Sequence, residues 1–382
     1  MAAIVRHGRG PLIDAICCAG HYNFLVSMGE WDCRTSMCKS AIVVRKGLHA
    51  GTLFLLLIMV MTGCAGMISH SRNVVVKRAQ MHMGTLVTIT AVASDLGVGH
   101  KAIQAGFNEI KRLERLLSTW IPESELSRVN AEAGSRPVPV SKETLDLVIR
   151  SLDLARLTDG GFNIAMGPAV ESWSVTERQR IPSDEELQGL KVLVDVTAIQ
   201  VDLETRTIYL LHKGMKIDVG GIGKGYAADR AAEEMKKAGA QGGVVALSGD
   251  IKTFGTLPDA AGFPVGIKHP RLEGVLIAVI DLRDEAISTA GDYERFFERD
   301  GIRYHHILDP KTLEPARTCQ SVTVIGKEGT LVDGLDTGIF VLGPEKGMAL
   351  IERLPGVEAL IVDDQGRMMV SSGLRARLRK PQ

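Results

Sequence analysis

The sequence predicts an α+β fold in which mixed, mostly antiparallel sheets pack against helices. Residues 81–93 alternate in polarity and are rich in Val, Ile and Thr, which is typical of a strand. Residues 99–117 place apolar side chains at helical spacing and charges on the opposite face. Such segments follow one another without strict alternation, which favours α+β over a parallel α/β sheet.

Composition narrows the class of protein further. The 382 residues, 45% of them hydrophobic, suffice for a sizeable core. Lys plus Arg and Asp plus Glu both number 45, so the formal net charge is zero, and aromatic residues make up only 4%. A nucleic-acid binder usually carries a basic excess or aromatic stacking platforms, so we expect no nucleic-acid partner.

Residues 1–64 are predicted to be an N-terminal extension that ends in an export signal. Arg45 and Lys46 precede an apolar core at 53–61, which is too short to span a bilayer as a helix. The following Met-Thr-Gly-Cys resembles a bacterial lipobox, which implies cleavage before Cys64 and a lipid on its thiol. We therefore expect a lipoprotein of the cell envelope that faces the periplasm or the outside of the plasma membrane. An ordinary signal peptide or a buried apolar segment is the alternative.

The mature chain is expected to contain one large domain. A polar linker at 65–80 leads into this domain, which is predicted to cover residues 81–375. The helix at 99–117 is followed by a loop and a second helix. Ser141 opens this second helix and the segment Asp159-Gly160-Gly161 ends it.

The middle of the domain alternates short elements with loops. Residues 161–173 are predicted to be an irregular loop and residues 183–190 a brief helix. Strands are predicted at 192–196 and 207–211. Residues 216–255 then indicate a strand, a glycine loop, a helix and a second strand.

The last third is predicted to be mainly β-structure. Short strands are expected throughout residues 265–325, and a helix at 344–354 stops at a Pro-Gly pair. A closing hairpin is expected to pair residues 359–363 with residues 367–371.

The segment 331–340 crowds two carboxylates and a hydroxyl just ahead of an apolar run. If a helix begins there, Asp333, Asp336 and Thr337 are neighbours on its surface, because they are three and four residues apart. Three hard oxygen ligands on one side of a helix suit Mg²⁺. The alternative is that Asp333 caps the helix and Asp336 is a solvated turn residue.

A glycine-rich loop runs from Asp218 to Gly225, between a predicted strand and a predicted helix. Glycines let backbone amides approach a phosphate, and the helix N-terminus favours the anion. Lys224 would add a positive charge. The pattern matches neither the P-loop nor the dinucleotide-binding fingerprint, and a tight strand-to-helix turn is the alternative.

Three further positions carry side chains suited to binding or catalysis. Trp120 lies in a predicted loop, where an indole can stack on a flat ring, although Trp is more often a core residue. Asn163 lies in a loop where turn chemistry is the alternative. His305 and His306 are adjacent, and one of them can act as a general base near neutral pH. Adjacent histidines on a strand point to opposite faces, which argues against a shared metal.

Taken together and in order, these motifs resemble the ApbE family of FAD:protein FMN transferases. The motifs are MGT, LSTW, DGGFNIAMGP, IDVGGIGKGYAAD, SGDI, ISTAGDYERFF, YHHILDP and DGLDTGIFVLG. The resemblance runs from about Met83 to Gly373 and implies an ApbE-like fold. Members of the family bind FAD and a divalent metal, usually Mg²⁺. They attach FMN to a Thr or Ser hydroxyl of a target flavoprotein and release AMP. Typical targets are subunits of membrane redox pumps and extracytoplasmic flavin reductases.

The resemblance also implies a role for individual positions. Contacts with FAD fall on Met83, Trp120, Gly161, Phe162, Asn163, Asp218, Lys224 and Ile307. Metal ligands fall on the backbone of Gly221 and on the side chains of Asp333, Asp336 and Thr337. Asp333 is expected to be essential for catalysis, and His306 is the candidate base. The family usually has Asp in place of Asn163, so this chain keeps a hydrogen-bonding group there but lacks a charge.

Two rival functions remain open at this point. A metal-dependent FAD pyrophosphatase would use water in place of the target hydroxyl and give FMN and AMP. A lipid-anchored flavin-binding protein without catalysis would not need Asp333, Asp336 and Thr337. The presence of all three residues favours an enzyme.

Overall fold

The computed structural model describes residues 73–381 of the chain. The predicted signal segment and Cys64 lie outside these residues. Among the described residues, none of the helices combines the length and apolar character needed to cross a membrane.

The centre of the fold is an eight-stranded sheet in which every pair of neighbouring strands is antiparallel. The prediction of mostly antiparallel sheets is thus confirmed. In spatial order its strands are β1 (Val74–His82), β2 (Thr85–Ala93), β6 (Gly242–Leu247), β7 (Asp250–Phe254), β10 (Ala286–Gly291), β13 (Cys319–Gly326), β14 (Glu358–Asp363) and β15 (Met368–Val370).

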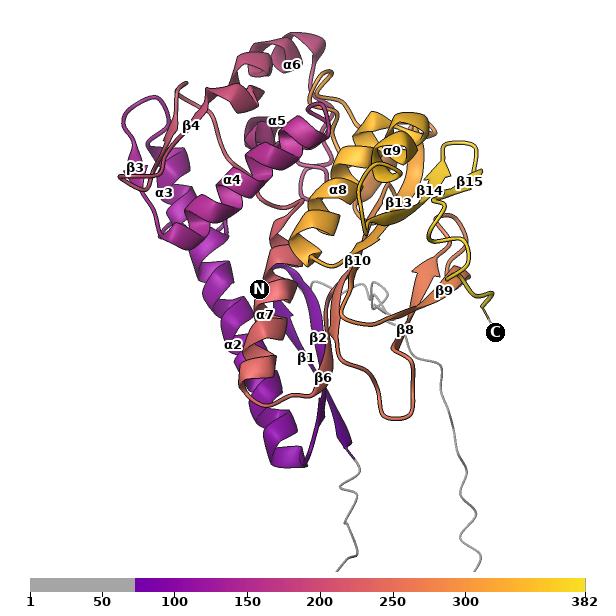
Figure 1. The fold of residues 1–382 in the computed structure, drawn as a ribbon. Helices are drawn as coiled ribbons and strands as arrows, with labels where there is room; N and C mark the ends of the chain where they lie inside the picture. The colour runs from indigo at the N-terminus through magenta and orange to yellow at the C-terminus, as the bar shows by residue number, and fades with distance from the viewer. Residues whose placement is uncertain (1–72, 382) are drawn as a thin grey trace, which may run out of the picture. The chain divides into compact units, whose positions relative to one another are not determined.

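Four helices cover one face of this sheet along its width (Figure 1). They are α2 (Leu96–Leu117) on β1 and β2, α7 (Gly223–Lys237) on β6 and β7, α8 (Gly329–Leu342) on β10 and β13, and α9 (Pro344–Ile351) on β14. The hairpin of β8 (Phe263–Lys268) and β9 (Leu276–Leu282) packs on the other face, where Ile280 joins a core with Ile287 and Leu360.

Smaller elements complete the fold. A three-stranded sheet has the order β3 (Val138–Pro139), β5 (Thr207–Leu210) and β4 (Ile199–Asp202), and β11 (Phe296–Arg299) pairs with β12 (Ile302–His305). The remaining helices are α3 (Glu125–Ala131), α4 (Lys142–Leu157), α5 (Gly167–Trp173) and α6 (Asp184–Leu190), with 3₁₀ turns at Ile164–Met166, Lys191–Val194 and Val196–Ala198.

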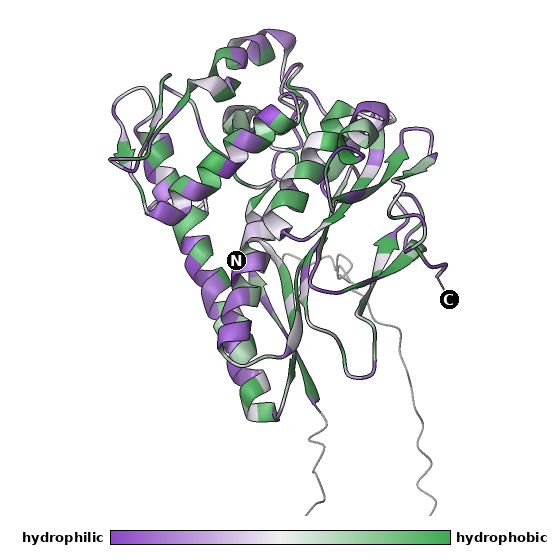
Figure 2. Ribbon diagram, viewed as in Figure 1, coloured by the Kyte–Doolittle hydropathy of each residue, from purple (hydrophilic) through white to green (hydrophobic). Residues whose placement is uncertain are grey.

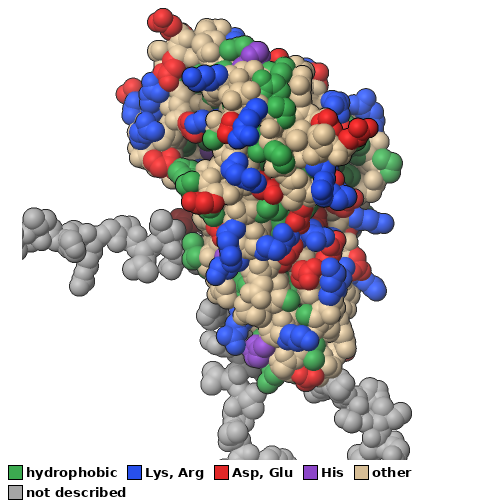
Figure 3. All heavy atoms as spheres, turned by 90° about the vertical axis from the view of Figure 1, so that its left-hand side faces the viewer, with side chains coloured by type: hydrophobic (Ala, Val, Ile, Leu, Met, Phe, Trp, Pro, Cys, Tyr) green, Lys and Arg blue, Asp and Glu red, His purple; other side chains and the backbone are tan. Residues whose placement is uncertain are grey.

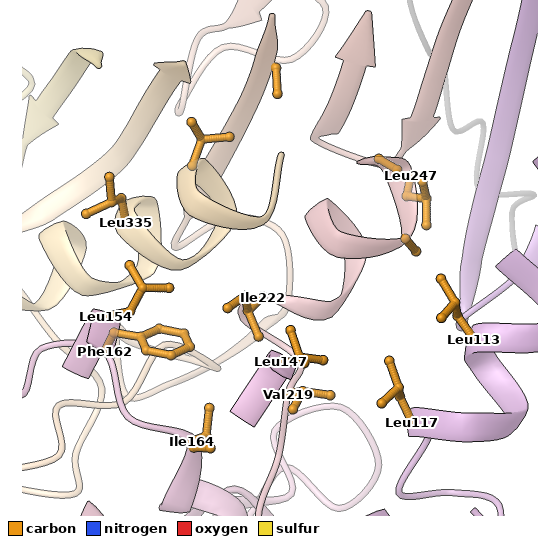
Figure 4. Close-up of a cluster of buried hydrophobic side chains, with 14 of the residues drawn as sticks. Leu113, Leu117, Leu147, Leu154, Phe162, Ile164, Val219, Ile222, Leu247 and Leu335 are labelled. Atoms are coloured by element: carbon orange, nitrogen blue, oxygen red, sulfur yellow. The ribbon is translucent and has the colours of Figure 1, made fainter. Parts of the chain in front are cut away.

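The hydropathy of the helices explains how they pack. In Figure 2, α2 carries an apolar stripe beside a polar one, whereas α8 is apolar over most of its surface. A surface helix needs only one apolar face, so α2 packs on the sheet and keeps its charges in water. The core that forms between helices and sheet includes Leu113, Leu154 and Leu335 (Figure 4). On the face drawn in Figure 3, positive and negative side chains are interspersed.

The N-terminal boundary of the domain differs from the prediction. Residues 74–80, expected in the linker, form most of β1, and the predicted strand 81–93 is the end of β1, a turn and β2. Met83 and Gly84 both have positive φ, as a two-residue hairpin turn requires. β1 is an edge strand, and Lys77, Arg78 and Gln80 are exposed on it. Because these polar residues break the alternation of apolar and polar side chains, the sequence did not predict this strand.

Three other predictions were wrong in part. The loop expected at 161–173 contains α5, which Pro168 initiates at its first turn. The strand expected at 192–196 is a pair of 3₁₀ turns. Within residues 73–381, the segment before the glycine loop pairs with no strand. Its backbone is instead fixed by the Asn130 side chain, which bonds both the N–H (2.7 Å) and the carbonyl (3.0 Å) of Ile217.

Candidate active site

Three aspartates from two elements meet beside the N-terminal end of α7. Asp250 opens β7, and Asp333 and Asp336 lie on one side of α8. One carboxylate oxygen of each lies within 4.8 Å of the others, and each residue is 2% exposed. We call these three residues the carboxylate cluster. Two of its members were predicted from the sequence, but Asp250 was not.

The cluster holds more negative charge than its neighbours balance. Lys224 forms an ion pair with Asp250, which leaves three carboxylates against one ammonium group. The Ser288 hydroxyl lies against both Asp250 and Asp336, with 2.5 Å from its Oγ to the Asp336 Oδ2. A hydroxyl has a single hydrogen, so Ser288 can donate to only one of these two carboxylates at a time.

The pKa values of the cluster reflect the same excess of negative charge. Burial and the charge of Asp250 raise the pKa of Asp333 to about 7, although Lys224 partly offsets them. Burial and the charges of Asp333 and Asp250 raise the pKa of Asp336 well above its usual range. Burial alone would lower the pKa of Lys224, but Asp250 and Asp333 outweigh it and the pKa is raised. A bound cation would remove the penalty on the ionised carboxylates.

Helices α7 and α8 hold the cluster by capping each other. The Asp333 Oδ2 accepts the backbone N–H of Gly225 at the start of α7 (2.8 Å). In return, Asp229 of α7 accepts the N–H groups of Gly329 (2.8 Å) and Thr330 (2.9 Å) at the start of α8. A Cβ on Gly225 would lie 2.1 Å from the Gly329 carbonyl oxygen, so only glycine permits this crossing. Asp333 therefore does not cap its own helix, as the alternative proposed, but caps α7.

The glycine loop lies against Thr337, the hydroxyl residue that follows Asp336 on α8. A Cβ built on Gly221 would lie 3.2 Å from the Thr337 Oγ1 and 3.3 Å from the Phe162 ring. The Thr337 hydroxyl itself donates to the Asp336 Oδ1 (3.1 Å). The backbone of Gly221 and the side chains of Thr337 and Asp336 are thus brought together, as the metal hypothesis requires.

The loop at 161–163 packs on α8 beside the glycine loop. A Cβ on Gly161 would lie 2.5 Å from the Gly338 carbonyl oxygen. Phe162 is buried, and Figure 4 shows its ring among core side chains that include Leu154 and Ile222. Any ligand contact at this position would have to come from the backbone. The Asn163 side chain is already bonded within the chain, because it accepts from Ala165 N (2.7 Å) and donates to the carbonyl of Val194 in a distant 3₁₀ turn (2.8 Å).

The other predicted FAD contacts lie in different environments. Trp120 is 82% exposed, so the alternative of a core Trp is excluded and its indole is free to stack. Met83 is half-buried in the β1–β2 turn, and its N–H donates to the Glu114 Oε1 (2.6 Å). The Asp218 Oδ1 accepts from Gly220 N (2.6 Å), and burial raises the pKa of Asp218. Ile307 is buried.

The two histidines point in opposite directions, as predicted. The His305 Nε2 bonds the Ala316 carbonyl (2.6 Å), and its ring packs edge-on against Phe340. The His306 Nδ1 lies 3.3 Å from the Arg295 carbonyl oxygen, which can only accept a hydrogen, so Nδ1 carries the proton and Nε2 is free to accept one. Burial and the charge of Arg295 lower the pKa of His306 to about 3, which keeps this ring neutral near pH 7.

Three residues of the site were missed by reasoning from the sequence. Asp250 and Ser288 lie on strands far from α8 in the chain, and Asp229 lies in the middle of α7. The motif around Asp250 did carry a signal, because the acid directly follows a Ser-Gly turn between two strands. Only the strand order of the sheet, which places β7 beside β10, brings Asp250 and Ser288 to α8.

The fold is that of an α+β protein, with helices on one face of an antiparallel sheet. Its site combines buried carboxylates, which are hard oxygen ligands, with a glycine loop at a helix N-terminus. The model of the ApbE family matches residues 83–361. The chain belongs to the ApbE family.

Relatives and solved structures agree with this assignment. The FAD:protein FMN transferase of Treponema pallidum is 34% identical over 319 residues, which cover 79% of this chain and 88% of the relative. The protein of the same name from Vibrio cholerae is 31% identical over 306 residues, 78% of this chain and 91% of the relative.

Two solved structures share the fold. The ApbE protein of Thermotoga maritima superposes with a TM-score of 0.75 at 31% identity, covering 80% of this chain and all of that one. The flavin transferase ApbE of Vibrio cholerae gives a TM-score of 0.72 at 28% identity, covering 80% and 99%. The predicted ApbE-like α+β fold is confirmed.

Proposed function

We propose that this protein is an FAD:protein FMN transferase that acts on a target flavoprotein. It cleaves the pyrophosphate of FAD, joins the FMN phosphorus to a Thr or Ser hydroxyl of the target, and releases AMP. The observation that carries the proposal is the buried carboxylate cluster beside the glycine loop, in a chain that matches relatives of this name along most of its length. A flavin-binding protein without catalysis would have no use for three buried, mutually repelling carboxylates.

The cluster fits a divalent cation, for which Mg²⁺ is our proposal. Three carboxylates, the Thr337 hydroxyl and a nearby glycine backbone offer the hard oxygen ligands that Mg²⁺ prefers. The raised pKa values of Asp333 and Asp336 indicate that the site lacks positive charge. When bound, a cation there would act as a Lewis acid on pyrophosphate oxygens.

The chain's own groups account for the remaining steps. His306 is our candidate base, since its Nδ1 is bonded to the Arg295 carbonyl and its Nε2 is left to take the proton of the target hydroxyl. The oxygen–phosphorus bond to the target then forms as the bond to AMP breaks. The positive end of the α7 dipole and the ammonium group of Lys224 add positive potential for the phosphates.

We also propose that the isoalloxazine ring stacks on Trp120, whose indole is exposed. The turn at Met83, the loop at Gly161 to Asn163, Asp218 and Ile307 would line the rest of the FAD site.

The direct test uses the chain from residue 66 with FAD, Mg²⁺ and the soluble flavin-accepting domain of a redox-pump subunit. We expect mass spectrometry to find one FMN added to the acceptor, with no addition in the presence of EDTA. Asp333→Ala should abolish the addition, because it removes both a cluster oxygen and the cap on α7. Metal-dependent turnover by this variant would refute the role of Asp333.

The same experiment separates the rival hydrolase. Release of AMP and free FMN without modification of the acceptor would establish a pyrophosphatase. Tight FAD binding with no AMP would establish a binding protein.

We further propose that the protein is a lipoprotein of the cell envelope, anchored through Cys64. The support is the sequence of the export signal alone. The mature N-terminus, measured by mass spectrometry on protein from the membrane fraction, should carry a lipid on Cys64, and Cys64→Ser should release the protein from that fraction. An unmodified Cys64 in soluble protein would contradict the anchor.

A further inference from the structure

A small arginine-rich cavity is lined by His305 at the end of β12, and His306 is not part of its lining. Its volume is about 100 Å³. The cavity is lined by charged and polar side chains, which include three arginines, two aspartates and one buried histidine: Arg271, Arg303, Arg317, Asp292, Asp364 and His305. None of these residues belongs to the carboxylate cluster or to the predicted FAD contacts.

The arginines of this cavity are not fully neutralised by the chain. Asp292 accepts a two-pronged ion pair from Arg271 (2.7 and 2.6 Å) and lies 3.5 Å from Arg303. Arg303 also bonds Glu298 (3.0 Å) outside the cavity. Arg271 and Arg303 are thus paired with Asp292 and Glu298, so the positive charge that the lining can offer to a ligand comes from Arg317.

Arg317 is the guanidinium group without a carboxylate. Its Nη1 donates to the Arg303 carbonyl (2.9 Å), and its guanidinium lies 5.5 Å from the centre of the Tyr304 ring. Within residues 73–381, no Asp or Glu forms an ion pair with it. These two contacts fix its position while several of its N–H donors stay free, which is the arrangement of a site that waits for an anion.

The cavity and the carboxylate cluster are both reached by residues of the β10 segment. Ser288, which contacts the cluster, and Asp292, which lines the cavity, are four residues apart on and just beyond β10. Four residues of extended chain span roughly 13 Å. An extended peptide that brings a hydroxyl to the cluster can therefore place a side chain about four residues away at the cavity.

The surface around the cavity also suits a protein partner. Leu272, next to Arg271, is 54% exposed, and Phe296, on which Arg303 stacks at 4.2 Å, is 39% exposed. Exposed apolar side chains next to arginines are typical of protein–protein contacts.

We propose that this cavity receives an acidic side chain of the acceptor protein, about four residues away from the hydroxyl that takes FMN. The inference rests on the proposed transferase function, and it names what the enzyme recognises in its protein substrate. Charge complementarity selects a carboxylate for this site. Leu272 and Phe296 would contact apolar side chains next to it.

Arg317→Glu is the variant that tests this site, because Arg317 is exposed and its loss leaves no buried carboxylate unpaired. The matched control is Arg299→Glu. Arg299 is an exposed arginine of the β11–β12 hairpin, which Arg317 contacts through Arg303 and Tyr304. Arg299 also lies over a ring, that of Phe297, but does not line the cavity. The acceptor is the soluble flavin-accepting domain of a redox-pump subunit. For binding measurements by calorimetry, its acceptor hydroxyl residue is replaced by Val.

We expect Arg317→Glu to raise both the KM and the Kd for the acceptor by at least about tenfold, with the KM for FAD unchanged. Arg299→Glu should leave all three constants near the wild-type values. Replacement of the acidic residue near the acceptor hydroxyl by Lys should weaken binding to the wild type and partly restore binding to Arg317→Glu.

Two failures can be told apart. If the wild type binds the acceptor but transfers no FMN, the transferase function is wrong, and the binding constants still test the cavity. If Arg317→Glu binds the acceptor as tightly as the wild type, or if Arg299→Glu weakens binding equally, the cavity is not the recognition site, whatever the transfer assay shows.

Discussion

At the scale of single residues, the carboxylate cluster makes the metal-free protein sensitive to pH. The folded state raises the pKa of Asp333 to about 7, whereas an Asp in an unfolded chain titrates near 3.9. Between these values the folded state binds more protons than the unfolded state. The free energy of unfolding therefore falls as the pH rises through this window, and Asp336 acts in the same direction.

We predict that Asp333→Asn removes part of this dependence. In EDTA, the Tm of the wild type should fall by several degrees more than that of the variant between pH 5 and pH 7.5. The amide oxygen can still accept from Gly225, so the cap on α7 is kept. Asp146→Asn, on the exposed face of α4, is the control and should follow the wild type. Parallel Tm curves for Asp333→Asn and the wild type would contradict the assignment.

His306 gives a second prediction at this scale. Its Nε2 is free and its ring is neutral near pH 7, so its loss should slow the chemical step and spare binding. We expect His306→Ala to lower kcat for FMN transfer by roughly 10²–10⁴-fold with little change in the KM for FAD. His305→Ala should instead lower the Tm, since His305 is bonded and packed in the interior. A similar kcat for His306→Ala and the wild type would rule His306 out as the base.

At the scale of elements, the mutual capping of α7 and α8 sets the geometry of the site. Glu328, the N-cap residue of α8, makes no side-chain capping bond, so Asp229 of α7 supplies that function from the neighbouring helix. The same crossing aims Asp333 at the start of α7. A change at Asp229 should therefore reach the carboxylate cluster through α8, although Asp229 is not part of it.

We predict that Asp229→Ala weakens the apparent Mg²⁺ affinity by about tenfold, as expected for a supporting group outside the ligand set. Asp229→Asn keeps one acceptor oxygen, so its apparent Mg²⁺ affinity should fall by less than that of Asp229→Ala. Saturating Mg²⁺ should restore most of kcat in both variants, measured well below their Tm. A lower Tm with unchanged Mg²⁺ affinity would show that Asp229 only stabilises the fold.

Elements were predictable from the sequence where local pattern decides. Apolar spacing predicted α2, which begins at Leu96 rather than at residue 99, and apolar spacing together with the cap Ser141 predicted α4. The brief helix expected at 183–190 is α6. The β14–β15 hairpin follows from its Asp-Gln-Gly turn. The start of β1 could not be predicted, because an edge strand exposes polar residues and lacks the alternating pattern. The true state of the segment at Ile217 could not be predicted either, because the Asn130 side chain takes the place of a strand partner.

At the scale of the whole molecule, the site depends on contacts that no local pattern contains. The spacing of Asp333, Asp336 and Thr337 within one helix could be predicted, since i, i+3 and i+4 positions are neighbours. Asp250 could not, because it reaches the cluster only through the strand order of the sheet. With this strand order, an ion bound to the carboxylate cluster would connect β7 to α8, so its binding should stabilise the domain as a unit.

This coupling predicts the effect of metal on global stability. An ion that binds only the folded state stabilises it by about 2.7 kcal/mol at 100 times its Kd, which is worth roughly 5 °C of Tm in a domain of this size. We expect Mg²⁺ to raise the Tm of the wild type by that amount, and of Asp250→Asn by less than half. Asp363→Asn is the control, because Asp363 is also a buried strand aspartate but bonds only its own turn and Arg367. Asp363→Asn should lower the Tm of the metal-free protein, but Mg²⁺ should raise its Tm by as much as it raises that of the wild type. An equal increment in Asp250→Asn and the wild type would exclude Asp250 as a ligand. The ligand set predicted from the sequence, which is the Gly221 backbone with Asp333, Asp336 and Thr337, would then remain.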